Sequence, residues 1–317
     1  MNGMLRVFLA AALAVMAASD ACAQKKRTRA PAKAAPKAAA AVPRPVQSAY
    51  RRTPYVGALA ADARTGRILF EENASARAYP ASVTKLMTLL LVLEDVAAKR
   101  YALTDRVKAT SDVYKAEPSA VGIRPGESMT VDDLLLSLMV KSANDAAIAL
   151  GIHASGSLDA FVARMNERAR QLGMADTRYY NPNGLPPNKR NGSKGFNVST
   201  CRDQLKLARV LVAMPQVFRY TSVKIGEVTD GRGEKLRFVN HNNVMVKDKL
   251  KVINPDGSEA VDGLKTGYID AGGSSVVLTG TRRGQRAIVV VLGSSSSKER
   301  DAAAKRLMSD ALDAVSW

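Results

Sequence analysis

The run from Ser82 to Lys99 constrains the fold of this chain more than any other segment. Its apolar residues cover almost every side of a helix: Leu86, Met87, Leu89, Leu90, Leu91, Val92, Leu93 and Val96. A surface helix carries one apolar stripe, whereas a helix that is apolar all round has to be buried. The sequence therefore predicts a helix that runs through the middle of a domain.

Strand-like runs occur on both sides of this helix in the sequence. The runs 55–62 and 67–71 flank a turn at Gly66 and predict a β-hairpin. Three more strand-like runs come late in the chain: 261–268, 274–281 and 287–292. Helices are expected between the two groups: 134–140, 145–153, 159–172 and 199–213. A one-sided apolar pattern over 298–315 predicts a last helix that packs on the sheet. The expected fold class is α+β, an antiparallel sheet built from both termini with an inserted helical lobe.

The first 52 residues differ from the rest of the chain. Residues 1–23 have one early cation, an apolar stretch and a small-residue site at Ala21–Ala23, which is the layout of a signal peptide cleaved after Ala23. An uncleaved membrane anchor is the alternative, but the apolar stretch is short of the roughly 20 residues that a span needs. Residues 24–52 hold nine cations and no acid among repeated Ala, Pro and Lys, which predicts a disordered tether.

The net charge of +18 is therefore unevenly distributed. The leader nets zero and the tether carries nine positive charges, so residues 53–317 keep +9. Anionic envelope polymers or a membrane surface are the expected partners of the tether, and a plain solubilising spacer is the alternative. Nucleic acid is not expected, because a signal peptide directs export and Tyr50 is the only aromatic residue in the tether.

The chain has two cysteines and two histidines, which limits its chemistry. Two cysteines cannot build a disulfide scaffold, and His153 and His241 are too far apart in the sequence to suggest a metal site. Cys22 leaves with the leader, so Cys201 is expected to be an unpaired, packed side chain and not a nucleophile. No metal or organic cofactor is expected.

Ser82-Val83-Thr84-Lys85, at the head of the apolar helix, is the first of three short motifs. Residues three apart share a helix face, so the Ser82 hydroxyl and the Lys85 amine should meet. Serine needs a neighbouring base to become a nucleophile, and lysine is a base only where burial or another cation lowers its pKa. The spacing alone is weak evidence, because Ser295–Lys298 repeats it.

The other two motifs are Ser142-Ala143-Asn144, between two expected helices, and Lys265-Thr266-Gly267, on a late strand. Ser142 could relay a proton and Asn144 could hold a substrate backbone, although helix capping explains both residues as well. Gly267 would allow a bound chain to approach the strand edge, although an exposed edge strand explains this motif equally. Each motif is weak alone, and the ordered set is typical of penicillin-binding proteins and class A β-lactamases.

With these motifs and their flanking residues, the chain resembles the serine D-alanyl-D-alanine carboxypeptidases of the low-molecular-mass penicillin-binding proteins. The matching stretches are Pro80–Thr88, Asn181–Leu185 and Val261–Gly267, and the resemblance runs from about Tyr55 to the C-terminus. It implies a β-lactamase/DD-peptidase-like transpeptidase fold for a catalytic domain at 53–317. It also implies a periplasmic or cell-envelope enzyme that trims peptidoglycan stem peptides ending in D-Ala-D-Ala, with β-lactams as covalent inhibitors.

The resemblance also implies roles for individual residues. Ser82 would attack the D-alanyl carbonyl, Lys85 would be its general base, and Ser142 would pass a proton to the departing D-alanine. Asn144 would hydrogen-bond the substrate amide, and Lys265 would supply positive potential and help to keep Lys85 neutral. The carboxylate of the substrate would meet Thr266 and Arg300, while the backbone N–H groups of Ser82 and Tyr268 would form the oxyanion hole.

Three alternatives remain. The chain ends 52 residues after Lys265, which resembles a trimmed periplasmic branch that cuts D-alanyl cross-links, so endopeptidase action is open. A class A β-lactamase would need a glutamate in a Glu-x-x-Leu-Asn loop, and none of the glutamates between Asn144 and Lys265 has that setting: Glu167, Glu227, Glu234 and Glu259. A non-catalytic envelope-binding protein is disfavoured because the motif residues are intact.

Overall fold

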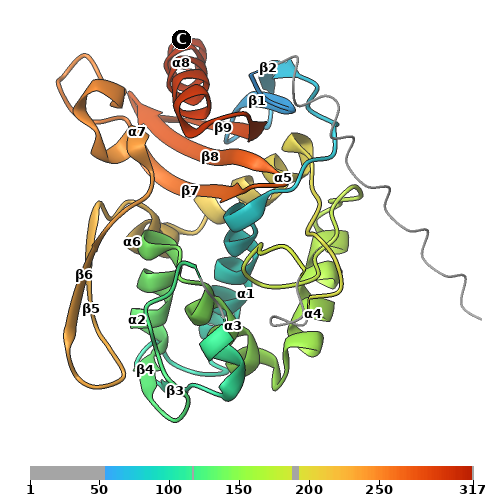
Figure 1. The fold of residues 1–317 in the computed structure, drawn as a ribbon. Helices are drawn as coiled ribbons and strands as arrows, with labels where there is room; N and C mark the ends of the chain where they lie inside the picture. The colour runs from blue at the N-terminus through green and yellow to red at the C-terminus, as the bar shows by residue number, and fades with distance from the viewer. Residues whose placement is uncertain (1–53, 116–117, 188–192, 316–317) are drawn as a thin grey trace, which may run out of the picture. The chain divides into compact units, whose positions relative to one another are not determined.

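A computed structural model describes residues 54–115, 118–187 and 193–315, which belong to one compact unit (Figure 1). The expected signal peptide at 1–23 and tether at 24–52 lie outside the described residues. Five strands form one antiparallel sheet in the order β2-β1-β9-β8-β7. They are β1 (Gly57–Asp62), β2 (Ile68–Glu72), β7 (Val261–Ile269), β8 (Gly273–Arg282) and β9 (Gln285–Ser294).

The sheet joins the two ends of the described chain, as the sequence predicted. β1 pairs with β9, so that Ala60 lies opposite Val289, and β8 continues the sheet to β7 at its edge. Successive residues of β9 alternate between two cores: Ile288, Val290 and Leu292 face one, and Ala287, Val289 and Val291 face the other. Both faces of the sheet are therefore buried, which explains why its late strands read as continuous apolar runs.

One helix covers one face of the sheet and the helical region meets the other (Figure 1). The last helix, α8 (Ser297–Val315), packs Leu307, Met308, Ala311 and Leu312 against β8 and β9, as its one-sided pattern predicted. The other face meets α1 (Lys85–Ala97), whose apolar residues from Leu86 to Leu93 are all buried. The expected central helix is thus confirmed, because α1 contacts other helices and the sheet at once.

The remaining helices form the region between the two sheet segments. They are α2 (Val131–Leu136), α3 (Asn144–Ser155), α4 (Leu158–Gln171), α5 (Cys201–Val212), α6 (Phe218–Thr221) and α7 (Asn243–Val246). Short 3-10 turns are η2 (Ala81–Thr84), η3 (Ser111–Lys115), η5 (Pro215–Val217) and η6 (Asp248–Leu250), and η4 (Ser137–Lys141) is a π-helical turn. Thr130 caps α2 by accepting a hydrogen bond from the Asp133 backbone N–H.

Two small antiparallel strand pairs were not expected from the sequence. They are β3 (Arg106–Lys108) with β4 (Ser128–Thr130), and β5 (Ile225–Thr229) with β6 (Lys235–Val239). Their strands are short and only half-buried, so charged residues dilute the apolar alternation that marks a strand.

One further difference concerns the end of a predicted helix. The predicted helix 134–140 is α2 followed by the π-helical turn η4, which ends at the left-handed Ser142. Within residues 54–115, 118–187 and 193–315, no single helix is long and apolar enough to span a membrane. The pair α3 and α4, bent by 86° at its break, passes that test by length and composition only.

Candidate active site

Ser82 lies in the 3-10 turn η2, immediately before α1 and beside the edge strand β7. Ala81 holds a left-handed φ of 50°, a conformation that costs free energy for a residue with a Cβ. Such strain persists only where neighbouring structure enforces it. Two glycines press on this turn from either side and provide that enforcement.

Gly267 on β7 and Gly184 in the loop before residue 188 are these two glycines. A Cβ at Gly267 would lie 2.7 Å from the Pro80 carbonyl oxygen and 2.9 Å from the Ser82 amide nitrogen. A Cβ at Gly184 would lie 1.9 Å from the carbonyl oxygen of Ala81. The sequence-based reason for Gly267, access for a bound chain, is therefore incomplete, because the turn that carries Ser82 already fills the space next to it.

Lys85 reaches three oxygen atoms from a fully buried position. Its Nζ lies 2.9 Å from Ser82 Oγ, 2.7 Å from Asn144 Oδ1 and 2.9 Å from the carbonyl oxygen of Asn183. A neutral amine has two N–H donors and one lone pair. It can donate to Asn144 and Asn183, whose oxygens only accept, and accept the proton of the Ser82 hydroxyl. The three contacts thus match the hydrogen-bonding pattern of a general base.

The electrostatics of the site favour that neutral form. Burial is the main cause that lowers the pKa of Lys85 well below its ordinary value, and the nearby charge of Lys265 lowers it further. The buried carboxylate of Asp145 opposes both effects. Burial, followed by the charge of Arg300, lowers the pKa of Lys265 itself to about 7. The predicted mechanism by which a lysine becomes a base is thus present around Lys85.

Asn144 opens helix α3, and Ser142 lies just before it. Ser142 has a left-handed φ of 59° at the end of η4, and no hydrogen bond joins its hydroxyl to another described residue. The oxygen of the Asn144 amide accepts from Lys85, so its amino group is the part left to donate to a substrate. A group bound by this amino group would therefore be a hydrogen-bond acceptor, such as the carbonyl oxygen of a substrate amide.

Asp145 fixes this part of the site, although the sequence analysis did not single it out. Its buried carboxylate accepts hydrogen bonds from the amides of Val121, Gly122 and Ile123, at 2.8 to 3.3 Å. In the same loop, the Ser119 carbonyl oxygen accepts from the Asn144 backbone N–H, and the Ser119 hydroxyl donates to the Lys141 carbonyl. The loop after residue 117 is thus bound to the Ser142–Asn144 turn. The sequence offers a weak hint of this role, because Asp145 directly follows the Ser142-Ala143-Asn144 motif.

Asn183 is the second residue that the sequence analysis left without a role. Asn181 shapes its loop by accepting hydrogen bonds from the amides of Asn183 and Gly184. Thr88 of α1 ties the same loop to the helix by donating to the Pro182 carbonyl at 2.7 Å. The Asn-Pro-Asn-Gly sequence signals a turn, but only the tertiary fold brings its carbonyl group to Lys85.

The remaining predicted residues lie on β7 and α8. Lys265 and Thr266 are buried, and the Lys265 amine donates to the Thr266 carbonyl at 2.9 Å. Tyr268 is 61% exposed, and its hydroxyl donates to Asp270. Arg300 is only 4% exposed and forms an ion pair with Asp301. Direct hydrogen bonds join Ser82, Lys85 and Asn144. The charge of Lys265 acts on Lys85, and the charge of Arg300 acts in turn on Lys265.

Cys201 and His153 lie outside this cluster, whereas His241 lies near it: burial, followed by the charges of Lys265, Lys141 and Lys85, lowers the pKa of His241 to about 4. Cys201 is a free, fully buried thiol whose pKa is raised by burial, consistent with a packed side chain. His153 packs edge-on against the ring of Tyr101. Among the described residues, no group of three or more His, Cys, Asp or Glu side chains could hold a metal ion.

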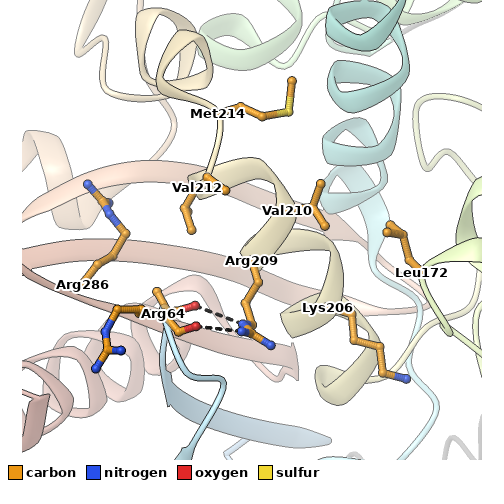
Figure 2. Close-up of a pocket in the computed structure, with 10 residues that line it drawn as sticks. Arg64, Leu172, Lys206, Arg209, Val210, Val212, Met214 and Arg286 are labelled. Atoms are coloured by element: carbon orange, nitrogen blue, oxygen red, sulfur yellow. Dashed lines mark hydrogen bonds between the residues drawn. The ribbon is translucent and has the colours of Figure 1, made fainter.

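A cavity of about 870 Å³ lies elsewhere, between the β1–β2 turn, α5 and the start of β9 (Figure 2). Its wall combines apolar side chains such as Leu172, Val210 and Met214 with four cations: Arg64, Lys206, Arg209 and Arg286. Three of these cations already have partners within the chain. Arg209 donates to the carbonyl oxygens of Ala63 and Arg64, Lys206 pairs with Asp203, and Arg286 pairs with Asp262. None of the predicted site residues lines this cavity.

Comparison with known proteins agrees with the motif pattern. A family model described as D-alanyl-D-alanine carboxypeptidase matches residues 54–296. The chain is 30% identical over 244 residues to D-alanyl-D-alanine carboxypeptidase DacF of Bacillus subtilis, which covers 77% of this chain and 58% of that protein. It is also 30% identical over 234 residues to DacB2 of Mycobacterium tuberculosis, covering 74% and 73%. The chain thus spans little more than half the length of several of its curated relatives.

Solved structures give the same result. A D-alanyl-D-alanine carboxypeptidase from Mycobacterium tuberculosis is 26% identical, with a TM-score of 0.68 over 84% of this chain and 92% of that one. Penicillin-binding protein D2 from Listeria monocytogenes, in its ampicillin-bound form, is 28% identical, with a TM-score of 0.67 over 81% and 97%. These matches confirm the expected fold class.

Proposed function

Because the chain belongs to the D-alanyl-D-alanine carboxypeptidase family, peptidase family S11, we propose that it is a serine D-Ala-D-Ala carboxypeptidase. Its substrates are peptidoglycan stem peptides that end in D-Ala-D-Ala, and β-lactams acylate the same serine. The observation that carries this proposal is the contact of the buried Lys85 amine with Ser82 Oγ at 2.9 Å.

In the acylation step, the Ser82 hydroxyl gives its proton to the neutral Lys85 amine as Oγ bonds to the carbonyl carbon of the penultimate D-alanine. The Asn144 and Asn183 oxygens accept from Lys85 and hold its lone pair towards Ser82. The backbone N–H groups of Ser82 and Tyr268 bind the oxyanion, and one such donor is typically worth about 10²–10³ in rate.

The tetrahedral intermediate then collapses, and the C–N bond to the terminal D-alanine breaks. Ser142 passes the proton from Lys85 to the leaving amine, so free D-alanine departs and an ester remains on Ser82. Water cleaves this ester, restores the Ser82 hydroxyl and releases the shortened peptide. Thr266, Gly267 and Lys265 form the strand edge beside the substrate, and Arg300 meets its terminal carboxylate.

Slow release of β-lactams follows from the positions of the acidic residues. Three of the four glutamates between Asn144 and Lys265 form ion pairs with lysine or arginine side chains: Glu167, Glu227 and Glu259. The fourth, Glu234, is exposed directly before β6. Asp145 lies close enough to act on Lys85, but backbone amides occupy its carboxylate. Neither these glutamates nor Asp145 can therefore activate water as the glutamate of a class A β-lactamase does. Rapid turnover of penicillin by the purified protein would contradict this reasoning.

Mass spectrometry of defined muropeptides tests the proposed activity. Loss of one terminal alanine from monomers supports carboxypeptidase action, whereas conversion of dimers into monomers supports the endopeptidase alternative. Ser82→Ala should lose both the reaction and labelling by a fluorescent penicillin, and Ser295→Ala, in the repeated spacing, is the matched control. A Ser82→Ala variant that labels as well as the wild type would exclude the serine mechanism and leave a non-catalytic envelope-binding role.

We also propose the domain organisation and location that the sequence predicts: a signal peptide at 1–23, a basic tether at 24–52 and the catalytic domain at 53–317. The enzyme would act in the periplasm or cell envelope of a bacterium and contribute to cell shape. The nine cations of the tether would bind anionic envelope polymers or a membrane surface. Salt-sensitive binding that is lost on deletion of residues 24–52 is the expected result, and binding that is unchanged by the deletion would contradict it.

A further inference from the structure

The Arg300 side chain is hydrogen-bonded to Asp301, and Asp301 is hydrogen-bonded to Asn243; neither Asp301 nor Asn243 has an assigned role. Asp301 Oδ1 accepts from Nε of Arg300 at 2.8 Å and from Nη2 at 2.6 Å. The other oxygen of the same carboxylate, Oδ2, accepts from Asn243 Nδ2 at 2.8 Å. Asn243 opens α7, 58 residues earlier in the sequence, so this chain of hydrogen bonds links two separate parts of the fold.

Burial makes this arrangement rigid. Arg300 is 4% exposed and Asp301 is 2% exposed, so water cannot replace the carboxylate as a partner. The Nε–Nη2 edge of the guanidinium is occupied, and no other described residue bonds to the Arg300 side chain. The edge that carries Nη1 is therefore left for a ligand, and its direction is set by Asp301.

The charge of the Lys265 amine makes such support necessary. Arg300 is close enough to contribute to the lowering of the pKa of Lys265, so two cations approach each other in a buried site. Without a counter-charge, the buried Arg300 guanidinium would be an unpaired charge beside a second cation, which is strongly unfavourable. Asp301 supplies that charge, and Asn243 keeps the Asp301 carboxylate from turning.

We propose that Asp301, braced by Asn243, is a positioning residue that aims the Arg300 guanidinium at the terminal carboxylate of the substrate. This inference rests on the proposed carboxypeptidase function. A carboxylate that only screened the charge of Arg300 would have the opposite effect, because its removal would strengthen the recognition of the substrate carboxylate. The sign of the mutational effect therefore decides between positioning and screening.

The test compares two substrates that differ only at the recognised group: a peptide ending in D-Ala-D-Ala with a free carboxylate, and its C-terminal amide. For Asp301→Ala, kcat/KM for the acid should fall about tenfold or more, while kcat/KM for the amide changes little. Asn243→Ala should shift the acid-to-amide ratio in the same direction by a smaller factor. If Asp301 had a merely structural role, its replacement would lower kcat/KM for both substrates by the same factor and leave the acid-to-amide ratio unchanged.

Asp310→Ala is the matched control, because Asp310 is an exposed aspartate on the same helix α8. Arg300→Ala should lower the acid-to-amide ratio of kcat/KM in the same way. The double variant with Asp301→Ala should show no further decrease, since both residues act on one interaction. An acid-to-amide ratio that is unchanged or raised in Asp301→Ala would overturn the positioning role. A wild-type protein that cleaves neither peptide would instead refute the proposed function.

Discussion

Replacing Gly267 by alanine tests whether the edge strand β7 sets the position of Ser82. The new methyl carbon would lie 2.7 Å from the Pro80 carbonyl oxygen, 2.9 Å from the Ser82 amide nitrogen and 3.0 Å from that of Val83. Ordinary contact begins near 3.4 Å, so the closest atom is about 0.7 Å too near. All three atoms belong to the backbone, so no side chain can turn aside, and either β7 or the Ser82 turn has to shift.

The size of the effect follows from this overlap. Overpacking of this kind costs about 1–3 kcal/mol of stability. A shift of the nucleophile by a good part of an ångström should slow acylation about 10- to 100-fold, because near 1 Å of misplacement can cost about 10² in rate. The assay is the second-order rate of labelling by a fluorescent penicillin, measured beside the free energy of unfolding in urea.

Gly280→Ala is the matched control, on the neighbouring strand β8. Its methyl carbon would lie 2.9 Å from the Ala260 carbonyl oxygen, a similar overlap with backbone, against Ala260 and Met308 instead of the Ser82 turn. Both variants should lose comparable stability, and only Gly267→Ala should label slowly. If Gly267→Ala labels at the wild-type rate, the close approach of β7 does not position Ser82 and the reasoning is refuted.

Three further predictions concern the core and the charges of the site. Leu90→Ala, in the fully buried middle of α1, should lower the free energy of unfolding by about 2–5 kcal/mol in urea titrations, and a loss under 1 kcal/mol would argue against tight packing there. The pKa of Lys265 is about 7 in the folded protein and 10.5 ordinarily, so between these pH values the unfolded chain binds more protons than the folded one. The free energy of unfolding of the wild type should therefore rise relative to that of Lys265→Met as the pH increases from 7 to 10.5. A fall in this difference with increasing pH would contradict the burial argument. The charge of Asp145 raises the pKa of Lys85, so Asp145→Asn should move the rising limb of the pH profile of penicillin labelling to lower pH; a shift to higher pH would show that another group titrates.

The fold class was predictable because its main elements have strong and local signals. The helix that is apolar all round became α1, and the apolar runs at both ends of the domain became one sheet. The hairpin of β5 and β6 escaped prediction because its strands are half-exposed and rich in charge. Its strands are held by pairing with each other, and this pairing leaves little trace in either strand alone.

The candidate site likewise combines features that local sequence determines with features that depend on the tertiary fold. The sequence by itself determined the residue types, because Ser82 and Lys85 meet through their spacing, and the ordered motifs identify the chemistry. Only the tertiary structure decided what surrounds the Lys85 amine: the Asn183 carbonyl comes from a loop 98 residues away, and the Asn144 oxygen from a helix 59 residues away. Burial and neighbouring charge set the pKa of a lysine, and both arise when distant segments pack together, so no local pattern can encode them.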